Sequence, residues 1–88
     1  MITIYVIRSI NTGRLYVGMT REMNTRLKEH NSGRSKYTAS FKPWELIYSE
    51  TAADYEAGRK REKYLKSTAG KLFIEKHGRG GITGSLSA

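Results

Sequence analysis

The fold is decided by one stretch near the start of the chain, ITIYVIRSINTGRLYVGM (residues 2–19). Its first part, Ile2–Ser9, is rich in β-branched and aromatic residues and predicts a strand. Residues 10–13 are typical of a turn, because Asn and Gly tolerate positive φ. The strand pattern resumes over Arg14–Met19, so we expect an antiparallel hairpin.

The length of this turn decides which side chains of the hairpin share a face. With a four-residue loop, Ser9 pairs with Arg14, and paired residue numbers then sum to an odd value. That register places Tyr5 and Tyr16 on the same face of the sheet. A three-residue loop would place the two tyrosines on opposite faces.

The segment after the hairpin predicts a helix, a loop and a third strand. Thr20 is a candidate N-cap for a helix over residues 21–31, which ends by Gly33 and carries an apolar stripe of Met23 and Leu27. Residues 32–43 predict a polar, basic loop that closes with the only proline of the chain. Residues 44–49 predict the third strand.

Two further helices are predicted after this strand. Thr51 is the candidate N-cap of the first, over residues 52–66. The second, over residues 69–76, is expected to bury Leu72 and Phe73 and to stop before Gly78. The sequence thus predicts an α+β fold with a three-stranded antiparallel sheet flanked by helices, in the order β-β-α-β-α-α. We expect a single domain over residues 1–76 and a flexible tail over residues 77–88.

The composition of the 88-residue chain favours a polyanionic partner. Sixteen Lys and Arg against eight Asp and Glu give a formal net charge of +8. The excess is concentrated in residues 26–42 and 59–66, each of which has five basic residues against one glutamate. Such clusters are typical of nucleic-acid binding, although a solvated face or a membrane-surface helix would also carry them. The residues expected to contact nucleic acid are Lys28, Arg34, Lys36, Lys42, Arg59 and Lys63.

Other classes of protein are disfavoured by what the chain lacks. It has no cysteine, which excludes disulfides, thiolate metal sites and cysteine nucleophiles. No apolar run approaches the roughly 20 residues of a membrane span, and the start does not resemble a signal peptide. We therefore expect a cytoplasmic protein that does not contact membranes.

Five residues are of the types that phosphodiester hydrolysis requires. Taken singly, each is more often structural: a tyrosine packs in a strand, and a charged side chain lies on a solvated helix. Taken together they offer a base, a phosphate clamp and a carboxylate for a metal ion. From these rules alone, a basic metal-dependent nuclease is one interpretation among several. The five residues are Tyr5, Tyr16, Arg26, His30 and Glu62.

The hairpin also resembles a known family. Thr3-Ile4-Tyr5, followed after ten residues by Tyr16-Val17-Gly18, resembles the paired motif of the GIY-YIG endonuclease superfamily. The resemblance continues through residues 26–33, 36–38, 43–48 and 57–63, and so covers residues 2 to about 75 in order. It is greatest to the small single-domain bacterial branch, similar to the nuclease domains of Slx-type resolvases and of the bacterial excision-repair incision subunit. The family fold is a three-stranded antiparallel sheet flanked by helices, which agrees with the predicted order.

This resemblance implies a role for each of the five residues. Tyr5 and Tyr16 would line the site, one of them as general base or its relay, and which one stays open. Arg26 would stabilise the pentavalent phosphate. His30 would orient a tyrosine hydroxyl or shuttle its proton. Glu62 would hold one divalent cation, Mg²⁺ with Mn²⁺ as a substitute, which binds the leaving 3′ oxygen.

Other positions either extend the resemblance or depart from it. Arg14 stands where related sequences often have a basic residue, and would contact the scissile phosphate. Thr3 replaces the first glycine of the motif, a change that strand geometry tolerates. The homing-endonuclease branch has an asparagine downstream of the metal-binding glutamate, and here no asparagine follows Asn31.

The function expected from these residues is a Mg²⁺-dependent DNA endonuclease that leaves a 5′-phosphate and a 3′-hydroxyl. So small a chain leaves little surface for reading sequence, so low sequence specificity is expected, with one active site per chain. Single-stranded, branched and duplex DNA all stay open as substrates. Two alternatives are a non-catalytic nucleic-acid binding module and a nuclease subunit that needs an accessory protein. Whether the protein acts as a homodimer also stays open.

Overall fold

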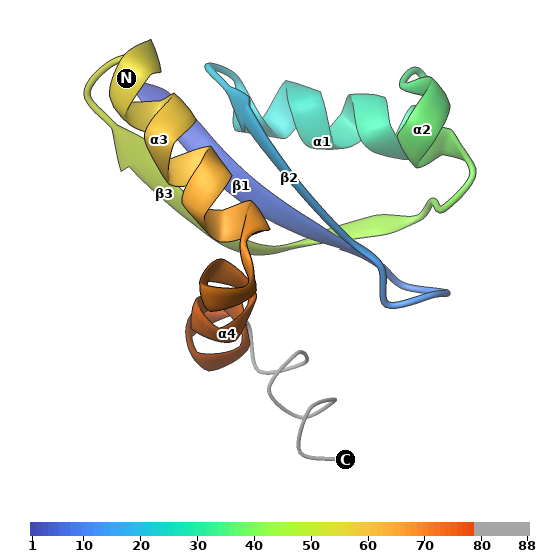
Figure 1. Cartoon of the computed structure of the whole chain (residues 1–88). Helices are drawn as coiled ribbons and strands as arrows, with labels where there is room; N and C mark the ends of the chain where they lie inside the picture. The colour runs from blue at the N-terminus through green and yellow to red at the C-terminus, as the bar shows by residue number, and fades with distance from the viewer. Residues whose placement is uncertain (79–88) are drawn as a thin grey trace.

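The computed structural model of the chain describes residues 1–78 and confirms an α+β fold built on one antiparallel sheet (Figure 1). The strands lie in the order β2-β1-β3, so the first strand of the chain is the central one. The element order is β-β-α-α-β-α-α, which adds one short helix to the predicted order. The elements are β1 (Ile2–Ser9), β2 (Leu15–Thr20), α1 (Met23–Ser32), α2 (Lys36–Ala39), β3 (Trp44–Ala52), α3 (Tyr55–Lys66) and α4 (Thr68–His77).

The predicted register of the hairpin is confirmed. Ser9 N–H donates to the Arg14 carbonyl at 2.8 Å, which closes the four-residue loop. Tyr5 lies opposite Gly18, and Ile7 lies opposite Tyr16. Because opposed residues project to the same face, the two tyrosines share one face of the sheet.

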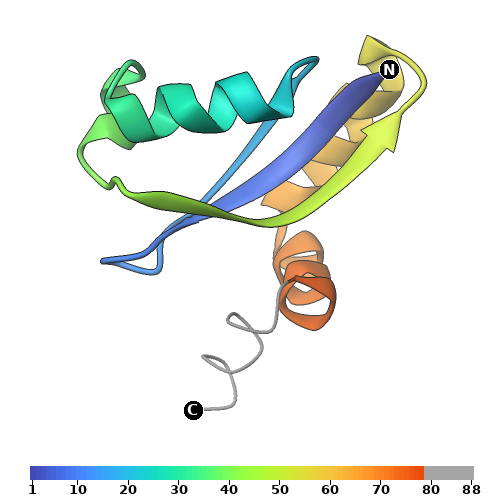
Figure 2. The ribbon, with the colours of Figure 1, turned by 180° about the vertical axis from the view of Figure 1, so that it is seen from behind.

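Each face of the central strand has its own core, as expected for a strand covered on both sides. On one face, Ile4 and Val6 pack with Leu65 of α3 and Ile74 of α4. On the other face, an aromatic cluster that includes Tyr5 packs against side chains of α1. Figures 1 and 2 show α1 and α2 on one side of the sheet and α3 on the other.

Two predicted N-caps are wrong. The residue before α1 is Glu22, while Thr20 lies two residues before Glu22 and its hydroxyl accepts the Glu22 N–H at 3.1 Å. Thr51 lies within β3, because that strand continues to Ala52 to complete its pairing with β1. The cap of α3 is Asp54, whose carboxylate accepts from Ala57 N–H at 2.9 Å.

The prediction that Leu72 is buried is also wrong. Gly70 lies against the end of α3, where an added Cβ would come within 2.5 Å of the Leu65 Cα. This close approach turns the Gly70 side of α4 inward, together with Ile74 one turn later. Leu72 is two positions from Gly70, points the other way and is 57% exposed, while Phe73 is half-buried.

The remaining predictions concern the loop before β3 and the C-terminal tail. The predicted loop over residues 32–43 contains the four-residue helix α2. Helix α4 includes His77, the first residue of the predicted tail, and residues 79–88 lie outside the described part of the chain. Within residues 1–78, no helix has the length and apolar character that a bilayer crossing needs.

Candidate active site at the edge of strand β2

The five predicted site residues come from three elements that meet at strand β2. This strand forms one edge of the sheet, with β1 as its only neighbour in the sheet. Helix α1 lies on one face beside it, and α3 contacts it from the other face. The edge of β2 is therefore where side chains from both faces can meet.

The Tyr5 hydroxyl lies beside Gly18 of β2, because this position has no side chain. Tyr5 itself is 1% exposed, and a Cβ added to Gly18 would lie 2.5 Å from its hydroxyl oxygen. An alanine at this position would therefore collide with the tyrosine. Sequence reasoning missed this role of Gly18, although a glycine inside a strand pattern is itself a sign of close approach by another group.

His30, near the end of α1, accepts a hydrogen bond from the Tyr5 hydroxyl. The oxygen lies 2.8 Å from His30 Nε2, and His30 Nδ1 lies 2.8 Å from the Thr38 hydroxyl. Thr38 is oriented by its own donation to the Ser35 carbonyl at 3.5 Å. Because Arg26 Nε also donates to the Tyr5 oxygen, we assign the Tyr5 proton to the bond with Nε2 and the ring proton to Nδ1, which then donates to Thr38.

Burial keeps this pair in its neutral form. Burial raises the pKa of the Tyr5 hydroxyl, an effect that its hydrogen bond with Arg26 opposes. Burial, together with the positive charge of Arg26, lowers the pKa of His30. A neutral tyrosine hydroxyl donating to a neutral imidazole is the state that these shifts favour.

Arg26 lies one helical turn before His30 and borders the same hydroxyl. Its Nε donates to the Tyr5 hydroxyl at 3.4 Å, and its Nη1 donates to Glu29 at 3.0 Å. These hydrogen bonds raise the pKa of the guanidinium and keep it charged. About a third of the side chain, 36%, is exposed, so a phosphate can reach it from solvent.

Tyr16 is the half-buried tyrosine of the pair and packs against several rings. Its ring centroid lies 6.3 Å from that of Tyr5 and 5.1 Å from that of His30, edge-on. On its other side lies Tyr37, at 6.1 Å. This packing fixes the ring of Tyr16 while leaving it in contact with the open edge of the sheet.

Glu62 approaches the edge from the other side of the sheet. It lies on α3, its side chain is 14% exposed, and its carboxylate accepts from Lys66 Nζ at 3.1 Å. Burial is the main cause of the raised pKa of Tyr5, and the negative charge of Glu62 is a smaller cause in the same direction. Glu62 is linked to this edge through Lys66, which borders the edge of β2 together with Tyr16.

The donor set at Glu62 suits only an ion that needs few protein ligands. Among residues 1–78 there is no group of three or more His, Asp or Glu side chains able to hold a metal. Mg²⁺ commonly binds through one or two carboxylates and completes its shell with waters and substrate phosphates. Glu62 offers one such carboxylate, and an ion bound there would replace Lys66 as its partner.

The basic residues predicted to contact nucleic acid lie in three places. Arg59 and Lys63 flank Glu62 on α3, and Arg14 stacks over the Phe41 ring at 4.4 Å next to the hairpin turn. Lys28 stands two residues from both Arg26 and His30, about 200° around α1, and so points away from the site. The other three, Arg34, Lys36 and Lys42, are exposed at or after the end of α1.

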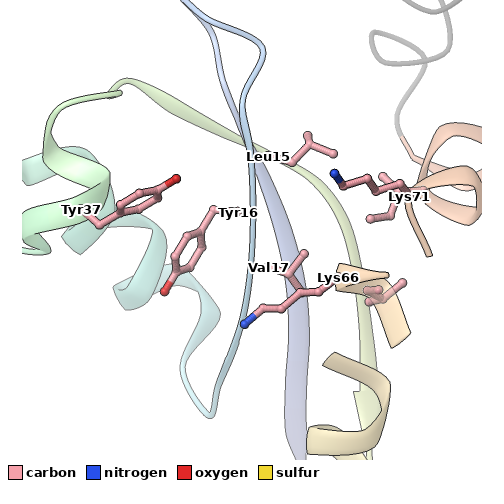
Figure 3. Close-up of a pocket in the computed structure, with 8 residues that line it drawn as sticks. Leu15, Tyr16, Val17, Tyr37, Lys66 and Lys71 are labelled. Atoms are coloured by element: carbon pink, nitrogen blue, oxygen red, sulfur yellow. The ribbon is translucent and has the colours of Figure 1, made fainter. Parts of the chain in front are cut away.

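A groove of about 400 Å³ runs along β2 next to these residues (Figure 3). Tyr16 and Tyr37 border it on one side of the strand, and Lys66 and Lys71 on the other. We call it the β2-edge groove. Sequence reasoning did not single out Lys71, because only the packing of α4 against α3 brings it to the edge.

Sequence comparison matches the chain to a family model and to bacterial relatives. A family model described as "GIY-YIG catalytic domain" matches residues 1–76. A UPF0213 protein of Staphylococcus epidermidis is 37% identical over 65 residues, which cover 73% of this chain and 78% of the relative. A UPF0213 protein of Bacillus licheniformis is 33% identical over 82 residues, covering 89% of this chain and 84% of the relative. No solved structure gave a significant match.

Proposed function

The chain belongs to the GIY-YIG catalytic-domain family, and we propose that it is a metal-dependent endonuclease that hydrolyses DNA phosphodiester bonds with low sequence specificity. The observation that carries this proposal is the convergence at β2 of Tyr5, Tyr16, Arg26 and His30 from one face and Glu62 from the other. Each chain has one such site.

Tyr16 is the better candidate for activating the attacking water. Tyr5 is 1% exposed and its hydroxyl already donates to His30, whereas Tyr16 borders the open β2-edge groove. A general base has to reach the proton that it removes. We assign Tyr16 to the water, and Tyr5, His30 and Thr38 to a buried hydrogen-bonded chain that positions Arg26 and the Tyr16 ring.

Arg26 and Glu62 supply the charges that the reaction needs. The exposed part of the guanidinium binds the non-bridging oxygens as negative charge develops on the phosphate. Glu62 would hold Mg²⁺ or Mn²⁺, which when bound stabilises the leaving 3′ oxygen. Cleavage then leaves a 5′-phosphate and a 3′-hydroxyl.

The exposed basic residues hold the DNA backbone without reading its bases. Arg59 and Lys63 flank Glu62, and Arg14 lies next to β2, so phosphates on either side of the cut can contact them. Contacts to phosphate carry no sequence information, which accounts for low specificity. The proposal also includes a cytoplasmic location. It includes as partner either an accessory protein or a second copy of the chain.

The experiment is a nicking assay on supercoiled plasmid with Mg²⁺, followed by end analysis of the products. Tyr16→Phe should lower the rate at least about 100-fold, since proton transfer by a positioned group contributes that much. Glu62→Gln should abolish the stimulation by Mg²⁺. The matched controls are Tyr48→Phe, a tyrosine that bonds Glu50 on the α3 face, and Glu56→Gln, an exposed glutamate of α3.

Both controls should cut at the wild-type rate. If Tyr16→Phe and Glu62→Gln also cut at that rate, the site is wrongly assigned. If the wild-type protein binds DNA in a salt-sensitive manner but never cuts it in Mg²⁺ or Mn²⁺, the protein is a non-catalytic binding module.

A further inference from the structure

We infer that the β2-edge groove binds one unpaired nucleobase next to the scissile phosphate, so that the preferred DNA has an unpaired nucleotide at the cut. This inference rests on the proposed nuclease function, since Tyr16 belongs to both sites. The argument uses the lining of the groove, the backbone of β2 and the charge around them.

The lining of the groove suits a flat, mainly apolar ring. Leu15 and Val17 of β2 form its aliphatic wall, and the fully buried side chains of Leu65 and Ile74 pack behind them. Tyr37 borders it with a ring that is 51% exposed. Its volume of about 400 Å³ lies within the range of sites for small organic ligands. A base stacked on an exposed tyrosine ring is a common arrangement in proteins that bind single strands.

The backbone of β2 offers hydrogen bonds in the same place. Because Ser9 N–H donates to the Arg14 carbonyl, residues 14, 16 and 18 turn their backbone groups toward β1. Leu15 and Val17 therefore turn their N–H and C=O groups outward, into the groove along the open edge. In a duplex the Watson–Crick edge of a base is occupied by its partner, so an unpaired base brings these backbone groups an additional edge of donors and acceptors.

The charge at the groove favours nucleic acid over a peptide strand, the other ligand that an open sheet edge attracts. Lys66 and Lys71 are exposed at its rim, and none of the described lining side chains is acidic. Lys66 also bonds Glu62, so a phosphate that binds Lys66 lies next to the carboxylate proposed to hold the metal. The base in the groove and the phosphate at the active site can thus belong to one nucleotide.

The test measures binding without divalent metal, so that it does not depend on cleavage. Three labelled duplexes of the same sequence are compared by fluorescence anisotropy in EDTA: fully paired, with one bulged nucleotide, and with an abasic residue at the bulge. We expect the bulged duplex to bind about tenfold or more tightly than the paired one, and the abasic bulge to lose that gain.

Variants at exposed tyrosines separate stacking from general charge. Tyr37→Leu should lose the preference for the bulge, and Tyr37→Phe should keep it, because phenylalanine still stacks. Tyr55→Leu, at an exposed tyrosine of α3 outside the groove lining, should bind as the wild type does.

The outcomes separate this inference from the proposed function. Equal affinity for all three duplexes, or a preference that survives both Tyr37→Leu and the abasic bulge, would overturn the inference even if the protein nicks plasmid DNA. The expected preference in a protein that never cuts would support the groove as a base site and overturn only the nuclease.

Discussion

Neighbouring residues of strand β1 serve two faces of the sheet that differ in chemistry. Ile4 faces α3 and α4 and belongs to a cluster in which every buried side chain is aliphatic. Tyr5 faces α1 and joins buried polar groups, among them His30 and Thr38, which are hydrogen-bonded to one another. Within residues 1–78, no buried side-chain nitrogen or oxygen lacks a hydrogen-bond partner. One face thus supplies most of the apolar burial, and the other holds groups capable of chemistry.

The difference shows how so small a protein can hold a polar site. Buried polar groups are stable only when each has a partner, and a fully bonded network fixes the geometry of its members. The aliphatic face does not need such partners, because its packing is not directional. The edge of β2 is where the candidate site draws on both faces, since Glu62 belongs to α3 on the aliphatic side.

The largest expected effect on folding is at Ile4. Ile4→Ala removes a fully buried aliphatic side chain and should lower the free energy of unfolding by about 2–5 kcal/mol. Because Ile4 faces away from the site, the folded fraction should nick DNA at the wild-type rate. Urea denaturation measures the first effect, and a rate corrected for the folded fraction measures the second.

The control is Leu72→Ala, a leucine that is 57% exposed on α4 and should change the free energy of unfolding by less than about 0.5 kcal/mol. An equal decrease in the free energy of unfolding for Ile4→Ala and Leu72→Ala would contradict the account of the aliphatic core.

The second effect is on activity, at Gly18. Gly18→Ala places a methyl group against the Tyr5 hydroxyl and displaces the chain of hydrogen bonds to His30. A displacement of about 1 Å near the reacting groups should lower the nicking rate about 100-fold. Overpacking should lower the free energy of unfolding by only about 1–3 kcal/mol.

Ser49→Thr is the matched variant, because Ser49 is the other cross-strand neighbour of Tyr5 and is exposed. It adds a methyl group on the β3 side of the tyrosine, away from Gly18, and should keep the wild-type rate. Full activity in Gly18→Ala would show that the position of the Tyr5 hydroxyl is unimportant.

The smallest effect is a pH dependence of stability that comes from His30. Burial lowers the pKa of His30 in the folded protein, so below pH ~6.5 the unfolded chain takes up the proton first. The stabilisation is complete above that pH and is lost as the pH falls toward the lowered pKa, with a slope of at most about 1.4 kcal/mol per pH unit.

Urea denaturation between pH 5 and pH 7.5 measures this slope. His30→Gln should reduce this slope, whereas Leu72→Ala, at an exposed position of α4, should keep it. An unchanged slope in His30→Gln would mean that burial and the charge of Arg26 do not hold the imidazole neutral.

Much of the sheet could be predicted from local signals. The turn chemistry of residues 10–13 sets the loop length, and the loop length sets which face Tyr16 occupies. The five site residues are of distinctive chemical types, and the resemblance to a family adds their order along the chain. The turn and the strands are encoded by residues close together in the sequence, and the family resemblance is encoded by the order of motifs along the chain.

The parts that sequence reasoning missed depend on contacts between distant segments. Helix α2 is one turn long and has no apolar periodicity. Thr38 holds this helix in place: its hydroxyl is hydrogen-bonded to His30, and its carbonyl accepts from Trp44 Nε1–H at 2.8 Å. The burial of Ile74 in place of Leu72 follows from the close approach of Gly70 to α3. The β2-edge groove requires α2, β2, α3 and α4 together, and no single segment predicts it.

The most direct test of the account is the position of Mn²⁺ in crystals of the protein, located by anomalous scattering. The account predicts one peak bound to the Glu62 carboxylate at the edge of β2, on the side that faces Tyr16 and Arg26, with Lys66 released from its ion pair. A peak held by other carboxylates, such as Glu45 or Glu50, while Glu62 keeps its bond to Lys66, would contradict it.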